Sequence, residues 1–103
     1  MALRTYRLVV AETETGEDIT ADVYNEEGTL AESARIPYED HGLTVDREGD
    51  APSEREHTFQ ADVTTMQLQT QRVDGAFDVS VLGDGETVHS ERLTDEEWGL
   101  TSS

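Results

Sequence analysis

Three histidines, His41, His57 and His89, are the side chains best suited to acid–base catalysis or metal binding near neutral pH. None stands at a spacing from another histidine that is typical of a metal-binding motif. We expect His41 to pack partly at a turn, His57 to be solvated at the end of a polar stretch, and His89 to point outward from a strand. The sequence therefore predicts no metal site, no cofactor and no catalytic residue.

Two arginines recur at equivalent places in the chain. Arg35 and Arg92 each precede an aliphatic residue that we expect to be buried, and each is followed by an acidic turn. The first interpretation is an ion pair with that turn, Glu39-Asp40 or Glu96-Glu97. The alternative is a symmetric pair of contacts to an anion or a carboxylate ligand. The candidate ligand-binding residues are Arg35, Arg92, His41 and Trp98.

Other chemistry-bearing patterns point to no site. The segment 46–50 resembles a calcium loop, but its glycine is fourth rather than sixth and no helices flank it. Paired glutamates occur where solvated turns are expected, so a raised pKa suited to acid catalysis is not expected. The chain has no cysteine, which excludes disulfides, thiolate metal sites and cysteine nucleophiles. Serine elbows and phosphate-binding loops are also missing from the sequence.

Alternating apolar and polar residues predict an antiparallel all-β fold. Strands are expected at 3–11, 19–24, 29–36, 58–63, 66–68, 77–81 and 87–93. Hairpin loops are expected at 25–28 and 83–85. The change of parity near Thr64 indicates either a β-bulge or a change of the buried face.

Two short helical turns are expected after the third strand and after the last. Residues 37–42 begin with proline and end with glycine, the usual polarity of a helical turn. Thr94 and Glu97 form a capping box, with Leu93 and Trp98 at the positions of a hydrophobic staple.

The two halves of the chain align at a constant offset. Residues 28–43 and 85–100 share six identities in sixteen positions without a gap. We interpret this as a duplication over approximately 3–43 and 58–100, joined by a polar linker at 44–57. The alternative is convergence of two similar hairpin-and-turn units.

Each copy would be a three-stranded meander that cannot bury its apolar face alone. We therefore expect residues 1–103 to form a single domain in which two meanders pack as a small barrel or a two-layer sandwich. An immunoglobulin-like sandwich is the alternative fold.

Charge is the strongest compositional feature. The chain has 24 Asp and Glu against seven Lys and Arg, a net charge of −17, and all seven basic residues are arginine. Such self-repulsion is screened when the Debye length falls from about 10 Å at 0.1 M salt to about 3 Å at 1 M. This composition is typical of cytoplasmic proteins of halophiles, chiefly haloarchaea, that accumulate monovalent salt. Intrinsic disorder is the competing interpretation, which the strand pattern opposes.

The same charge bears on partners and location. Nucleic acid and anionic membranes are disfavoured because the few arginines are scattered. No apolar run is long enough for a membrane span or a signal-peptide core, so a cytoplasmic location is expected. We expect a non-enzymatic protein-binding or self-associating module. The alternative is a small-molecule binding protein or enzyme with a pocket between the two repeats.

Salt dependence follows directly from this charge. Dialysis from molar KCl to low salt is expected to abolish the β signal in circular dichroism, because the repulsion between carboxylates is no longer screened. An unchanged spectrum and melting temperature at low salt would contradict the halophile interpretation.

Overall fold

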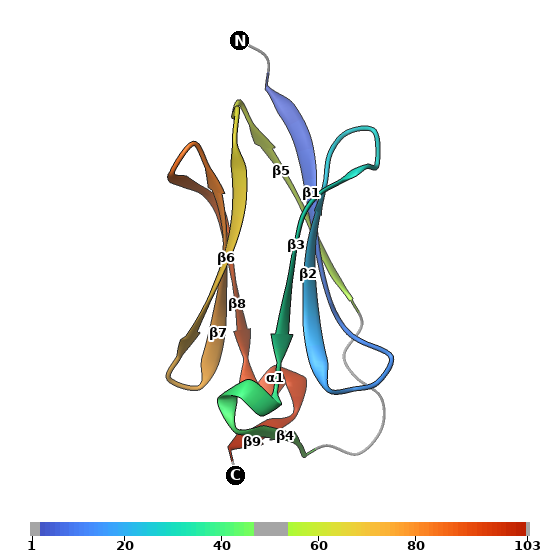
Figure 1. Cartoon of the computed structure of the whole chain (residues 1–103), viewed down its shortest axis with the longest axis vertical. Coiled ribbons are helices and arrows are strands. Elements are labelled where there is room, and N and C mark those ends of the chain that lie inside the picture. The colour runs from blue at the N-terminus through green and yellow to red at the C-terminus, as the bar shows by residue number, and fades with distance from the viewer. Residues whose placement is uncertain (1–2, 47–53, 103) are drawn as a thin grey trace.

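The computed structural model describes residues 3–46 and 54–102 and is mostly antiparallel β-structure, as the sequence predicts (Figure 1). The strands are β1 (Arg4–Glu12), β2 (Asp18–Tyr24), β3 (Leu30–Pro37), β4 (Leu43–Val45), β5 (Arg55–Ala61), β6 (Met66–Val73), β7 (Ala76–Gly83), β8 (Glu86–Thr94) and β9 (Leu100–Ser102). The helical turns are η1 (Glu39–His41) and α1 (Asp95–Trp98). No helix in the described ranges is long and apolar enough to cross a membrane.

Two larger sheets face each other, and a small third sheet lies at one end (Figure 1). The first sheet has the order β3-β2-β1-β5 and the second the order β6-β7-β8. Strands β3 and β6 approach each other along one side of the two layers without pairing. Strands β5 and β8 are the other outer strands, and side chains from both meet between the layers.

One apolar layer fills the space between the sheets. Alternate residues of each strand point inward, since successive side chains of a strand lie on opposite faces. The hydrophobic residues with at most 1% exposure are mainly branched or aromatic: Leu8, Val10, Ile19, Ala21, Val23, Phe77, Val79, Val81, Leu93 and Trp98. They belong to a single cluster that includes residues of both sheets, so each sheet buries its apolar face against the other.

The turns use the residues that their backbone requires. Asp84 and Gly85 have φ values of 52° and 87°, and together they form the two-residue hairpin loop between β7 and β8. Gly42 ends η1 with a φ of 66°. The Thr94 side chain accepts a hydrogen bond of 3.3 Å from the backbone N–H of Glu97. The predicted helical turns and the threonine cap are therefore confirmed.

Strands β4 and β9, which follow η1 and α1 respectively, pair with each other in the small third sheet. They are antiparallel, with Thr44 opposite Thr101. The offset of 57 residues in the sequence alignment also matches Thr44 with Thr101. If a rotation of 180° exchanged the two strands, each residue would take the place of its own pairing partner and the pairing would be unchanged, as a twofold axis requires. The duplication itself stays a prediction.

The structure corrects the predicted linker. Both ends of 44–57 lie in strands, since β4 extends to Val45 and β5 begins at Arg55; residues 47–53 lie outside the described residues. Strand β5 pairs with β1 and completes the first sheet, so the repeat boundary at residue 58 divides a strand. The parity change near Thr64 is the passage from β5 to β6, which belong to different sheets.

The immunoglobulin-like alternative is not supported by the sheet orders. In that fold the chain passes repeatedly between the two sheets through Greek-key connections. Here β1, β2, β3 and β5 form one layer before the chain enters the other at β6.

Candidate functional site

Polar side chains converge on the inner faces of the sheets where β5 and β8 lie. His57 of β5 pairs in register with Leu8, and His89 of β8 pairs with Val81; both partners are completely buried. Glu91 follows two residues after His89, so it shares the same inward face. These three side chains come from both sheets and are the only ones in the described ranges that form a histidine-containing cluster of potential metal ligands.

The three groups are close enough to share a ligand. Nε2 of His57 lies 3.2 Å from Oε2 of Glu91, and Nε2 of His89 lies 3.7 Å from the same oxygen. The donor atoms all lie within 4.8 Å of one another. The side chains are 36%, 23% and 19% exposed for His57, His89 and Glu91 respectively, so the cluster lies at the boundary between core and solvent.

The two imidazole Nε2 atoms are buried, and neither has a hydrogen-bond partner among the described residues. The His89 contact with Glu91, at 3.7 Å, is too long for a hydrogen bond, and the His57 contact, at 3.2 Å, is an ion pair when that imidazole is protonated. Buried polar atoms are normally paired, because leaving one unpaired costs about 1–3 kcal/mol. Two such atoms directed toward one carboxylate therefore require an explanation.

Neighbouring side chains hold this cluster in place. The ring of Phe59 stacks on His89 with centroids 5.1 Å apart and planes at 6°. Arg55 donates a 2.5 Å hydrogen bond to Glu97 of α1 and lies over the ring of Trp98. Strand β5 is thereby bound to both β8 and α1 by side chains.

The outward orientation predicted for His89 is wrong, and His57, with 36% of its side chain exposed, lies at an inward position of β5 and not in a linker. The predicted linker includes residue 57, although this residue has the same parity as the buried Phe59. His89 was expected to point outward, but it has the same parity as Leu93, which is buried. Counting back from Leu93 in steps of two would have placed both His89 and Glu91 inside. Their proximity to His57 depends on how the two sheets face each other, which no local pattern shows.

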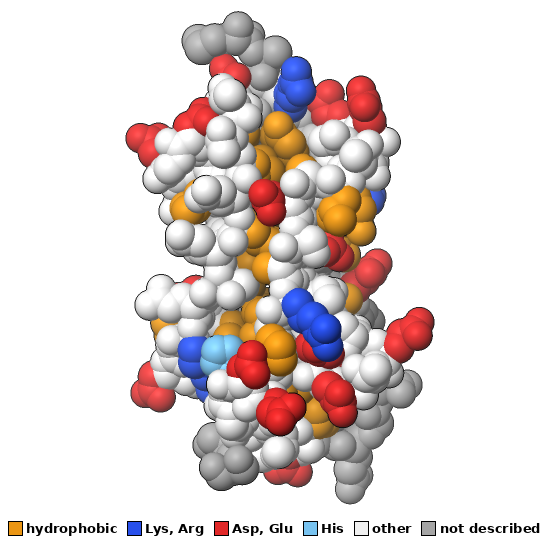
Figure 2. Space-filling model, viewed as in Figure 1, with side chains coloured by type: hydrophobic (Ala, Val, Ile, Leu, Met, Phe, Trp, Pro, Cys, Tyr) orange, Lys and Arg blue, Asp and Glu red, His pale blue; other side chains and the backbone are white. Residues whose placement is uncertain are grey.

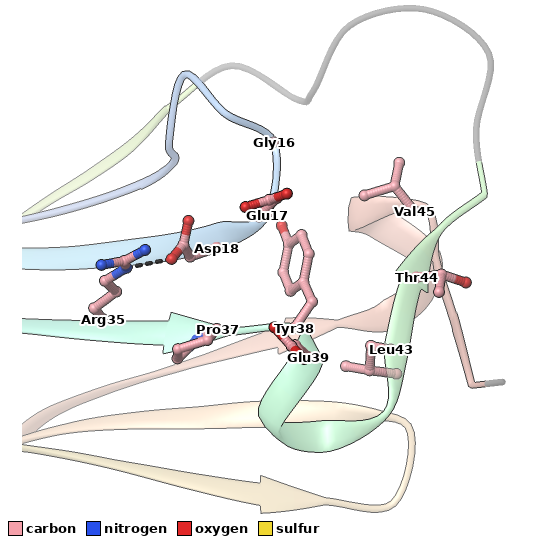
Figure 3. Close-up of a pocket in the computed structure, with 10 residues that line it drawn as sticks. All are labelled: Gly16, Glu17, Asp18, Arg35, Pro37, Tyr38, Glu39, Leu43, Thr44 and Val45. Carbon is pink, nitrogen blue, oxygen red and sulfur yellow. Dashed lines mark hydrogen bonds and ion pairs between the residues drawn. The ribbon is translucent and has the colours of Figure 1, made fainter.

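A cavity of about 330 Å³ lies beside Arg35, at the end of the molecule where β4 runs (Figure 3). Its lining residues are Gly16, Glu17, Asp18, Arg35, Pro37, Tyr38, Glu39, Leu43, Thr44 and Val45. Figure 3 shows the Tyr38 ring between Asp18 and the residues of β4. Tyr38 is almost completely buried, and its hydroxyl donates a 2.7 Å hydrogen bond to Glu12.

Asp18 is the buried carboxylate of this region, with 1% of its surface exposed. The hydroxyl of Thr13 donates a 2.7 Å hydrogen bond to it, and Arg35 Nε donates another. The Thr13 hydroxyl, and after it the Arg35 guanidinium, hold the pKa of Asp18 below its usual value. Arg35 therefore pairs with Asp18, and the predicted pairing with Glu39-Asp40 is not observed.

Arg92 has a similar role on the second sheet. It donates hydrogen bonds of 2.8 and 3.2 Å to the two carboxylate oxygens of Asp78, its register partner on β7. This pairing lowers the pKa of Asp78 and raises the pKa of Arg92. Both arginines thus form ion pairs across neighbouring strands, and not with the acidic turns that follow them.

The other two candidate residues, Trp98 and His41, are not part of the cluster formed by His57, His89 and Glu91. Trp98 is completely buried in the core. His41 is exposed on η1, where its ring meets the edge of Phe77 at a centroid distance of 5.0 Å. The structure therefore does not bring Arg35, Arg92, His41 and Trp98 into one site.

Strand β6 differs from the other outer strands in its charge. Residues 63–71 are the longest uncharged run in the sequence, and they include most of β6. Gln67, Gln69 and Gln71 are exposed along it. Figure 2 shows hydrophobic side chains along the middle of the face where β6 and β3 lie, with acidic side chains around them. The acidic coat is thus interrupted at this edge.

Comparison with protein-family models, with curated proteins and with solved structures found no match for this chain.

Replacement of Asp18 by Asn is expected to lower the melting temperature in molar KCl at pH 7 by several degrees, because the buried carboxylate loses its charged pairing. The pKa of Asp18 is lower in the folded chain than in the unfolded chain, where it is about 3.9, so the ionised carboxylate stabilises the fold at pH values above about 3.9. This stabilisation is lost as the pH falls through the pKa of Asp18 in the folded chain. The difference between wild type and Asp18→Asn should therefore shrink below about pH 4.

The matched control for this experiment is Asp40→Asn, which removes one exposed carboxylate. It should change the melting temperature little at either pH. Equal melting temperatures for the wild type and Asp18→Asn at pH 7 would show that the Asp18 network is not stabilising.

Proposed function

We propose that this protein is a non-enzymatic assembly module in which β6 pairs with β6 of a second copy. The observation that supports this proposal is an outer strand without acidic residues in an otherwise strongly acidic chain. Carboxylates keep like molecules apart, so a contact between copies is favoured where they are missing. An unpaired strand edge of low charge is also the usual template for pairing with another chain.

The four outer strands differ in how well they would accept a partner strand. Strand β3 carries Glu32 and ends at Pro37, and β5 and β8 carry charged residues within their length. Charges and proline protect sheet edges from pairing. Strand β6 has eight residues and no proline, glycine or acidic side chain. Its arginine, Arg72, is held by Asp95 in two hydrogen bonds of 2.6 and 2.7 Å.

The solvent forms part of the proposal. The net charge of −17 and the absence of lysine in the sequence support function in molar monovalent salt, as in the cytoplasm of a salt-accumulating halophile. Under those conditions the charged loops of two copies repel each other weakly. A neutral edge strand is then free to provide the contact.

The second candidate function is small-molecule binding in the cavity beside β4. Its volume of about 330 Å³ and its mixed lining of Arg35, Tyr38 and Leu43 support this alternative. An anionic ligand there would have to compete with Asp18 for the Arg35 guanidinium.

The assembly proposal predicts a dimer in molar KCl, measured by light scattering and sedimentation equilibrium over a range of concentrations. Gln69→Glu is expected to raise the dimer dissociation constant by about tenfold, because it puts two carboxylates close together across the paired strands. The matched control is Gln60→Glu, which adds the same charge to an exposed position of β5. A monomeric wild type, or equal effects of both substitutions, would contradict the proposal.

A further inference from the structure

We propose that His57, His89 and Glu91 form a binding site for a divalent first-row transition-metal ion, of which zinc is the representative. This inference is independent of strand pairing by β6. It rests on the two buried Nε2 atoms that lack hydrogen-bond partners in the described chain and on the carboxylate that both approach.

The donor set favours a transition-metal ion. Two imidazole nitrogens with one carboxylate oxygen are a recurrent ligand set for zinc and for its first-row neighbours. Magnesium and calcium prefer ligand shells made of oxygen. The numerous exposed carboxylates of this chain can hold such hard cations loosely, but the convergence of two imidazoles occurs at this one cluster among the described residues.

The distances are close to those of a tetrahedral site. Ligands about 2.0–2.1 Å from a tetrahedral zinc ion lie about 3.4 Å from each other. The separations of 3.2 and 3.7 Å from the Glu91 oxygen to the two imidazoles lie on either side of this value. All donor atoms lie within 4.8 Å of one another, so side-chain rotations that place each donor about 3.4 Å from the other two would complete the geometry.

The surroundings restrict those rotations. His89 is stacked on Phe59, which is itself stacked on Tyr6 with centroids 5.6 Å apart. The strands beneath the cluster are held by buried residues of β1 and β7. The ligands are therefore largely preorganised, which lowers the entropic cost of metal binding.

Two consequences follow from the location of the site. Three protein ligands leave one position of a tetrahedral ion for water or for an external ligand. The metal would also connect the two sheets, since His57 belongs to the first and the other two ligands to the second. Binding should therefore stabilise the folded chain, because the unfolded chain has no such site.

The test is a zinc titration of the whole chain after treatment with a chelator, in molar KCl with excess magnesium to occupy the exposed carboxylates. We expect one zinc ion per chain and a higher melting temperature. In nuclear magnetic resonance spectra of the wild type, zinc should shift the ring signals of His57 and His89 and leave those of His41 in place. This readout needs no variant, so it is unaffected by any variant that fails to fold.

Variants then identify the ligands. His57→Gln and His89→Gln, each verified by circular dichroism to be folded, are expected to weaken zinc binding by at least about tenfold. His41→Gln is the matched control and should bind zinc as the wild type does. Zinc binding that is undetectable, or that is equally tight in all three variants, would overturn the proposal; the polar cluster would then serve only to keep β5 and β8 from pairing with other chains.

Discussion

The structure depends on one apolar layer shared by two sheets. About a third of the residues are hydrophobic, 34% of the chain, and they suffice to cover one face of each sheet. Neither sheet can bury that face by itself, so the two must pack together. The buried residues of β1, β2 and β7 pack against each other in this layer. Polar side chains therefore lie on the outer faces of the sheets, in the turns and along the sides of the layer.

The sides of the layer are where the chain departs from a simple division of apolar inside and charged outside. On the side of β5 and β8, His57, His89 and Glu91 occupy inward positions that apolar residues would normally fill. On the other side, β6 has no acidic residue, although acidic residues are frequent on the rest of the surface. Natural sequences tend to break such local rules at functional positions. Both proposals concern these two departures, one for a metal ion and one for a second copy of the chain.

Local patterns in the sequence predict most of the fold. Alternation identifies β1, β2 and β7, and the cap at Thr94 locates α1. Local patterns do not predict the partners of the arginines or the histidine cluster. The arginine pairs depend on the register between neighbouring strands, and the histidine cluster depends on how the two sheets pack against each other. Arg35 meets Asp18 across strands, not along its own turn. His57 and His89 are 32 positions apart in the sequence, and only the packing of the layers makes them neighbours.

The central claim is that the two sheets face each other so that β5 and β8 lie along the same side. Nuclear Overhauser measurements in molar KCl test it most directly, since the chain has only three histidines to assign. Ring centroids of His57 and His89 are 5.7 Å apart, and the ring of His89 lies on Phe59. The structure predicts cross-peaks between the ring protons of His57 and His89, and between those of His89 and Phe59. A folded chain without either cross-peak would contradict this arrangement of the sheets.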